Sequence, residues 1–163
     1  PCPCGNYGSR ITPCRCTAQQ IQRYRNRISG PMLDRIDIHV EMGEVGYNDI
    51  AGRSCGEPSS AIRARVNAAR AIQTRRYAGM GILFNAQLTN RMMNQYCVLT
   101  SDAESLMKKA FAALKLSARA YTRLLKVSRT IADLAGSEQI KAEHIAEAIQ
   151  YRSLESKYWG EIK

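Results

Sequence analysis

Apolar residues recur at every third or fourth position over most of the second half of the chain, which is the spacing of one face of an α-helix. The pattern predicts three helices, over residues 101 to about 115, 117 to about 135, and 140 to about 152. Ser101 or Thr100 would cap the first helix, Ser117 would cap the second, and Gly136 would end it. A three-helix bundle of this size is marginal alone, so we expect it to pack against other elements.

The first half of the chain shows shorter helical patterns between polar connections. Helices are predicted from Thr17 to about residue 28, from Ser59 or Ser60 to about residue 77, and from Thr89 to about residue 97. Residues 36–42 alternate apolar and polar side chains, which predicts a strand with one buried face. The fold class expected from the sequence is therefore mostly α, with one isolated strand.

The chain carries a net charge of +10, and its bases are mostly arginine, 17 against 7 lysines. Hydrophobic residues make up 45% and charged residues 23%, which excludes a disordered tail, a fibre and a disulfide miniprotein. No apolar run approaches the roughly 18 residues of a membrane helix. The arginine excess indicates an anionic partner, either nucleic acid or a nucleotide phosphate. A solvated basic surface is the alternative.

Four cysteines crowd the first sixteen residues as two C-x-C pairs, Cys2 with Cys4 and Cys14 with Cys16. Four thiolates on one loop can surround a tetrahedral ion, and the softness of the ligands favours Zn²⁺. The usual zinc spacing is C-x2-C, so four free thiols or oxidised thiols remain the alternative. Cysteine usage of this kind indicates a reducing, cytoplasmic compartment.

Two arginines stand where they could reach a phosphate. Arg35 lies just before the predicted strand, where its side chain could extend beyond its own subunit. Pairing with Asp34 or Asp37 is the simpler interpretation. Arg119 lies in the first turn of a predicted helix, where a cation opposes the helix dipole, and Arg123 shares its face one turn later. Both could bind nucleotide phosphates or simply be surface residues.

Further arginines are candidates for sequence-independent contacts to a DNA backbone, with scattered surface arginine as the alternative. These are Arg23, Arg25, Arg27, Arg63, Arg70 and Arg76.

Seven stretches together carry a resemblance to one family. They are Cys2-Pro-Cys4-Gly5, Cys14-Arg-Cys16, Arg27-Ile-Ser-Gly-Pro-Met-Leu-Asp-Arg35-Ile-Asp-Ile-His39, Asn85-Ala-Gln-Leu88, Leu116-Ser-Ala-Arg119-Ala-Tyr121, Arg129-Thr-Ile-Ala-Asp-Leu-Ala135 and Ala148-Ile-Gln-Tyr-Arg152. The chain resembles the magnesium-chelatase-like AAA+ ATPases of the ComM/YifB family across nearly its whole length. The resemblance implies a C-terminal piece of an AAA+ module, in which Arg35 matches the trans-acting arginine finger and Arg119 the sensor-2 arginine.

The resemblance also implies what the whole protein does. The family uses ATP and Mg²⁺, and proteins of the ComM type act as hexameric DNA branch-migration helicases in natural transformation. The Walker A and Walker B motifs of the family lie upstream, and no G-x4-G-K-[S/T] occurs in this sequence. We therefore expect a cytoplasmic homo-hexamer whose partners are its own N-terminal ATPase core and DNA, with no membrane contact. The chain alone should not hydrolyse ATP.

Four segments follow from these expectations: a Cys4 zinc loop at 1–16, the end of the AAA+ core with its arginine finger at 17–50, a basic helical insertion at 51–100, and a helical lid with sensor 2 at 101–163. Two alternatives remain, a chelatase subunit that inserts metal into a tetrapyrrole and a stand-alone zinc- and DNA-binding module.

Overall fold

The computed structural model describes residues 1–52, 56–152, 154, 158 and 159, with the backbone alone at positions 48 and 49. The chain divides into two compact units, Pro1–Gly52 with Arg152–Lys163 and Arg53–Tyr151. The prediction of a mostly helical chain is confirmed. The predicted boundary near residue 100 falls inside the second unit, because the basic segment and the bundle share a core there. Among the described helices, none combines the length and apolar character that crossing a bilayer requires.

The first unit contains three short helices, α1 (Ala18–Arg25), α2 (Gly30–Leu33) and α3 (Tyr47–Ala51). Thr17 caps α1 as predicted: its hydroxyl accepts from the Gln20 backbone N–H, and the Gln20 side chain accepts in return from the Thr17 N–H. Helix α1 ends three residues earlier than expected. Helix α2 is a single helical turn with Pro31 in its first positions.

The strand predicted at residues 36–42 does not form, because none of these residues belongs to a strand or a bridge. Ile38, Val40 and Met42, which would face a core, are instead 48%, 63% and 83% exposed. Alternation of side chains favours an extended backbone, but a strand also needs a neighbour that accepts its ladder hydrogen bonds. No such neighbour lies beside this segment in the described part of the chain.

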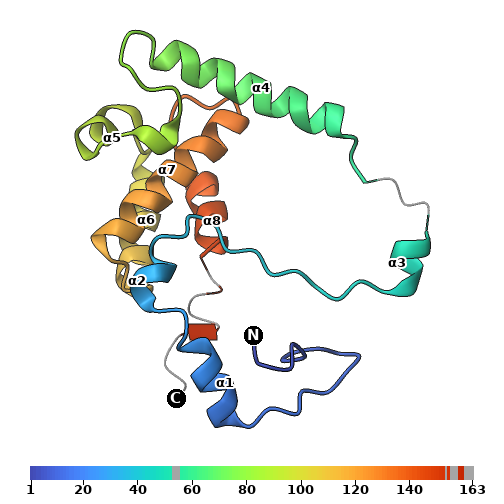
Figure 1. The fold of residues 1–163 in the computed structure, drawn as a ribbon. Coiled ribbons are helices and arrows are strands. Elements are labelled where there is room, and N and C mark those ends of the chain that lie inside the picture. The colour runs from blue at the N-terminus through green and yellow to red at the C-terminus, as the bar shows by residue number, and fades with distance from the viewer. Residues whose placement is uncertain (53–55, 153, 155–157, 160–163) are drawn as a thin grey trace. The chain divides into compact units, whose positions relative to one another are not determined.

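The second unit, which Figure 1 shows in green to orange, is built from helices. Its elements are α4 (Ser59–Arg76), the 3₁₀ turn η1 (Asn85–Gln87), α5 (Asn90–Tyr96), α6 (Ser101–Ala113), α7 (Ala118–Leu134) and α8 (Ala142–Gln150). The predicted caps Thr89, Thr100 and Ser117 accept hydrogen bonds from the first turns of α5, α6 and α7. At α4 the predicted serine cap is wrong, because Pro58 occupies the cap position and both serines are helical.

Helix α7 lies at the centre of this unit and packs against α8, α4, α5 and η1. Gly136, with φ of +67°, ends it in a Schellman motif in which the Ser137 N–H donates to the Ala132 carbonyl at 2.8 Å. The predicted glycine stop is thus confirmed. A parallel bridge between Leu99 and Ile140 ties the segments that precede α6 and α8. Because side chains from α5, α6, α7 and α8 all meet in one apolar core, these helices stabilise one another.

Only the C-terminal half of α4 packs against α7. Ala69 and Gln73 are buried, whereas Ile62 and Val66 nearer the start of the helix are 43% and 44% exposed. Figure 1 shows the N-terminal half of α4 reaching past the bundle.

A buried carboxylate, Asp133 on α7, joins three elements of the second unit. Arg76 of α4 donates to Asp133 Oδ2 at 2.9 Å, and Asn85 of η1 donates to the same oxygen at 2.8 Å. Arg129, one turn earlier on α7, donates through Nε to Oδ1 at 3.1 Å. Gln73 completes the set at 3.2 Å. A single carboxylate therefore compensates two guanidinium groups, as a buried charge requires.

Besides its ion pair with Asp133, Arg129 holds the segment of chain that follows α7. Its two terminal nitrogens donate to the carbonyls of Ser137 and Glu138, the latter at 2.7 Å, and the residue is 1% exposed. Burial raises the pKa of Asp133, but the hydrogen bonds from Arg76 and Asn85 outweigh burial and leave the pKa lowered. Asp133 is therefore ionised at neutral pH.

Replacing Asp133 with asparagine keeps the shape and removes the charge. We expect the free energy of unfolding to fall by about 3 kcal/mol, because Arg129 is left buried without a counter-ion. Urea titration followed by circular dichroism measures the change. The control is Glu57→Gln, which breaks the exposed pair with Arg65 and should leave the midpoint unchanged. A wild-type midpoint for Asp133→Asn would contradict the role of the network.

His144 provides a pH-dependent contribution to stability. Its Nδ1 accepts from the Lys141 N–H at 3.0 Å, and burial lowers its pKa although Glu143 opposes the shift. The unfolded chain therefore binds the proton more readily than the folded one, and stability should fall as pH drops through about 6.5. His144→Gln keeps an acceptor at this capping position. In thermal melts between pH 5 and 7.5, the variant should show a flatter dependence than the wild type. Equal slopes would exclude His144 as the source.

Candidate functional site

The four cysteines near the N-terminus converge, as the sequence predicted. All four sulfur atoms lie within 4.8 Å of one another. Cys2 Sγ lies 3.4 Å from Cys4 Sγ and 3.6 Å from Cys14 Sγ, and Cys4 and Cys14 are separated by 3.5 Å. A tetrahedral Zn²⁺ with bonds of about 2.3 Å places its sulfurs about 3.8 Å apart. The donor set and its spacing therefore fit zinc.

The loop between the cysteine pairs folds through tight turns. Gly5 and Gly8 both adopt φ of +82°, a conformation that side chains disfavour. The Gly5 N–H donates to the Cys2 carbonyl at 3.1 Å, and Ser9 Oγ accepts from the N–H groups of Ile11 and Thr12. Of the four thiols only Cys2 is buried, so the cluster lies near the surface.

The cysteines differ in acidity before any metal binds. Backbone N–H groups of Asn6 and Arg15 point at the Cys4 sulfur and lower the pKa of Cys4 to about 6. The Cys4 N–H would lower the pKa of Cys16 as well, but desolvation and the neighbouring thiols outweigh it and raise that pKa to about 12. One thiolate is thus available at neutral pH, and a bound cation would stabilise the others.

Arg35 follows Asp34, which caps the end of α2, and its side chain is exposed. Its guanidinium donates to the Pro31 carbonyl at 2.9 Å. Asp34, one of the two expected partners, pairs instead with Arg152 at 3.4 Å. Arg35 has no carboxylate partner within the described residues, so its charge is available to an external anion.

Arg119 is the second residue of α7, and it is exposed. Ser117 caps the start of α7, and its hydroxyl accepts a hydrogen bond from the Ala120 N–H at 3.1 Å. Arg123, one turn later, is half-buried. The two arginines therefore share a face of α7, as their spacing predicted.

The six arginines predicted to contact DNA fall into two groups. Arg23 and Arg27 in the first unit and Arg63 and Arg70 in the second are exposed, and the Arg70 guanidinium lies 3.8 Å from the centre of the Phe84 ring.

Arg25 and Arg76 do not lie on the surface as expected. Arg25 is 5% exposed, and Arg76 is bound to Asp133. Both point inward along α1 and α4, where each satisfies groups of its own unit. A helical position cannot be assigned to the surface from its residue type when long side chains can bury their charge against a partner.

The sequence did not single out the polar residues beside Arg23. Gln19, Gln22 and Asn26 line an open hollow on α1 together with Arg23 and Arg27. Their spacing of three and four residues could have indicated a shared face, but uncharged amides carry no distinctive signal in a sequence. The Asp133 network was missed for a different reason: its members are far apart along the chain.

Comparison with known proteins gives the chain a family. The family model described as "Magnesium chelatase, subunit ChlI C-terminal" matches residues 56–152. The family model described as "Magnesium chelatase, subunit ChlI" matches residues 1–50. The chain belongs to the magnesium chelatase ChlI family. The second match ends at residue 50, close to the end of the first compact unit.

Relatives within this family carry the names ComM and YifB. The "Competence protein ComM" of Haemophilus influenzae is 42% identical over 155 residues, and the "Uncharacterized protein YifB" of Salmonella typhimurium is 40% identical over 156 residues. The "Uncharacterized protein YifB" of Escherichia coli is 38% identical over 157 residues. These alignments cover 94–95% of this chain but 29–30% of each relative. They confirm the resemblance to the ComM/YifB family.

Proposed function

We propose that this chain is the C-terminal part of an AAA+ ATPase that assembles into a cytoplasmic ring and remodels DNA. In this ring Arg35 acts as the arginine finger toward a neighbouring subunit, and Arg119 acts as sensor 2 toward the nucleotide of its own subunit, with Arg123 beside it. The name of the Haemophilus relative supports a role in competence. DNA branch migration during natural transformation is the activity that the resemblance to the ComM/YifB family implies.

The observation that carries the proposal is the exposure of two unpaired guanidinium groups at helix ends. The side chains of Arg35 and Arg119 each project from a backbone segment that hydrogen bonds hold in place. Neither guanidinium pairs with a carboxylate in the described part of the chain. A cation delivered to a transferring phosphoryl group stabilises the charge that develops in the transition state. ATP and Mg²⁺ would be held by the N-terminal core of the full-length protein.

DNA is the proposed substrate because of the arginine excess. Arg63 and Arg70 on α4, Arg23 on α1 and Arg27 just after α1 are exposed, and their charge suits a phosphate backbone without base specificity. The alternative, metal insertion into a tetrapyrrole, is favoured by the chelatase names of both matching family models.

We assign a structural Zn²⁺ to Cys2, Cys4, Cys14 and Cys16. The sulfur spacing supports this assignment, and the loop of residues 1–16 contributes a single buried apolar side chain, that of Cys2. A metal would supply the cross-link that orders such a segment. It would have no open coordination position and so no part in the chemistry of ATP hydrolysis.

The finger role is tested in the full-length protein by Arg35→Ala. Hydrolysis should fall about a thousandfold or more while nucleotide affinity is kept, because the lost interaction forms in the transition state. Steady-state ATPase rates and binding of a fluorescent nucleotide measure the two effects, with Arg91→Ala as the control at another exposed arginine. Undiminished turnover would reject the assignment. Stimulation of the wild-type rate by protoporphyrin and not by DNA would favour the chelatase alternative.

The zinc assignment predicts about one metal ion per chain in protein purified without chelator. Zinc should protect the four cysteines from iodoacetamide, and chelation should expose them. Cys97 is the internal control, because burial raises its pKa to about 11 and keeps it unreactive in both states. Elemental analysis and peptide mass spectrometry give the readouts. Substoichiometric metal with equal alkylation before and after chelation would count against the site.

A further inference from the structure

Both ends of α1 are fixed by residues that adjoin the cysteine cluster. At the start, Cys16 directly precedes Thr17, which caps the helix. At the end, Arg25 turns inward and its Nε donates to the carbonyl of Pro1, the neighbour of Cys2, at 3.5 Å. The first and last cysteines of the cluster therefore adjoin the residues that hold the two ends of one helix.

Arg25 makes the contacts that hold the end of α1 against the cysteine loop. Its guanidinium carbon lies 4.6 Å from the centre of the Tyr7 ring, which belongs to the cysteine loop, and 5.5 Å from that of Tyr158. Its backbone carbonyl accepts from the Trp159 ring nitrogen at 3.1 Å. Desolvated cation–π contacts of this kind contribute substantially to packing. Arg25 thus serves the inner face of α1, together with buried Ile21.

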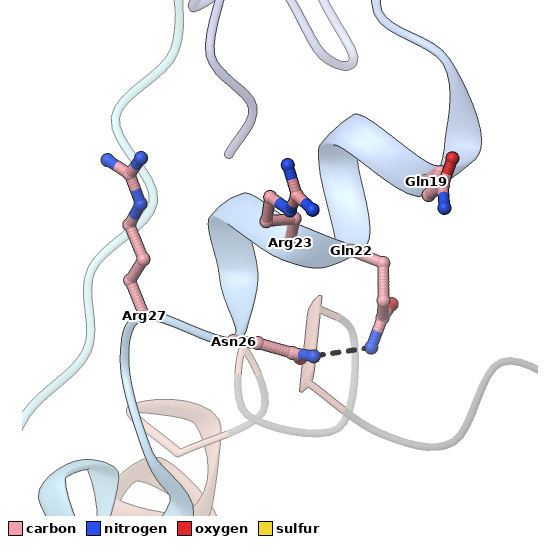
Figure 2. A pocket seen from close by; sticks show the side chains of 5 residues that line it. All are labelled: Gln19, Gln22, Arg23, Asn26 and Arg27. Atoms are coloured by element: carbon pink, nitrogen blue, oxygen red, sulfur yellow. Dashed lines mark hydrogen bonds between the residues drawn. The ribbon is translucent and has the colours of Figure 1, made fainter.

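The opposite face of α1 is polar and open. Gln19, Gln22 and Arg23 of α1, with Asn26 and Arg27 that follow it, line an open hollow of about 490 Å³. Figure 2 shows how these five side chains lie. None of the five is acidic, and Gln22 donates to Asn26 at 3.1 Å. Within the described part of the chain, neither Arg23 nor Arg27 pairs with a carboxylate. Arg27 also lies over the Tyr24 ring, 5.7 Å from its centre, and that ring is 38% exposed.

Helix α1 is eight residues long, and isolated helices of that length are not stable in water. Its shape must come from the contacts of its ends and inner face, and these contacts lead to the cysteine loop. We propose that the outer face of α1 binds a nucleic-acid backbone through Arg23 and Arg27, and that metal binding at the cysteine cluster is what keeps this face in its binding conformation. The inference rests on the proposed DNA function and adds a location and a metal dependence to it.

The chemistry of the face favours a nucleic acid over an acidic peptide. Two guanidinium groups can hold successive phosphates, and three amides offer both donors and acceptors to sugar and phosphate oxygens. A ring beside them suits a stacked base, which an acidic peptide does not offer. Contacts of this type give affinity without sequence preference and depend steeply on salt.

The test measures binding of a fluorescein-labelled 20-nucleotide single strand to the full chain between 50 and 300 mM salt. In Arg23→Ala/Arg27→Ala, the slope of log K against log salt should fall by about 1.4, since each phosphate contact contributes about 0.7. The matched control is Arg75→Ala/Arg91→Ala, which removes the same charge from exposed positions of the other unit and should leave the slope unchanged. Circular dichroism verifies that each variant is folded.

The metal dependence is tested with Cys14→Ser/Cys16→Ser and, independently, with chelated wild type. Each should lose the same slope as Arg23→Ala/Arg27→Ala, and combining the two pairs of substitutions should cause no further loss. Cys97→Ala, which removes a thiol outside the cluster, should bind as the wild type does. Additive losses, or an unchanged slope without metal, would overturn the coupling.

The outcomes separate this inference from the proposed function. If the wild type binds DNA and Arg63→Ala/Arg70→Ala lowers the slope while Arg23→Ala/Arg27→Ala does not, the α1 face is rejected and the DNA function stands. If the wild type binds no DNA at any salt concentration, both are rejected. Competition by polyglutamate and not by unlabelled oligonucleotide would also overturn the α1 assignment in favour of an acidic protein partner.

Discussion

The second unit depends on one buried carboxylate. Asp133 compensates Arg76 and Arg129 at once and accepts from Asn85, and these contacts connect α4, η1, α7 and the turn that leads to α8. Each of these groups would be costly to bury alone, so the elements that carry them must come together in a single arrangement. Apolar packing brings the helices together, and the ionic network specifies how α4 crosses the end of α7. The start of α7, with Arg119, lies on the same rigid element.

The first unit is organised by a different constraint. The segment before α1 has few buried apolar side chains, and its conformation relies on two tight glycine turns and on the convergence of four thiols. A cross-link in such a loop removes conformational entropy from the unfolded chain that packing cannot offset. The two units therefore differ in what orders them. The second unit has an apolar core and an ionic network, whereas the first has tight turns and the proposed metal site.

Arginine has two uses in this chain, and they divide along the helices. Arg25 and Arg129 are buried and Arg76 is half-buried, and each is held by carbonyls, carboxylates or aromatic rings of its own unit. Arg35 and Arg119 stay exposed at helix ends, where an external phosphate can reach them. The net charge of +10 therefore overstates the positive charge at the surface, because some of the arginines bind groups inside their own unit.

Local patterns in the sequence determined much of this protein. Spacing and side-chain chemistry within a few residues account for the helices of the second unit and for the grouping of the cysteines. They also account for the caps at Thr17, Thr100 and Ser117 and for the stop at Gly136.

Only the tertiary structure decided the rest. The segment at 36–42 has strand alternation but no neighbour to complete its hydrogen bonds, and Arg25 and Arg76 turned inward because partners distant in sequence were there to receive them. Pairing between distant residues leaves no periodic signal, and it is this pairing that separates a buried arginine from an exposed one.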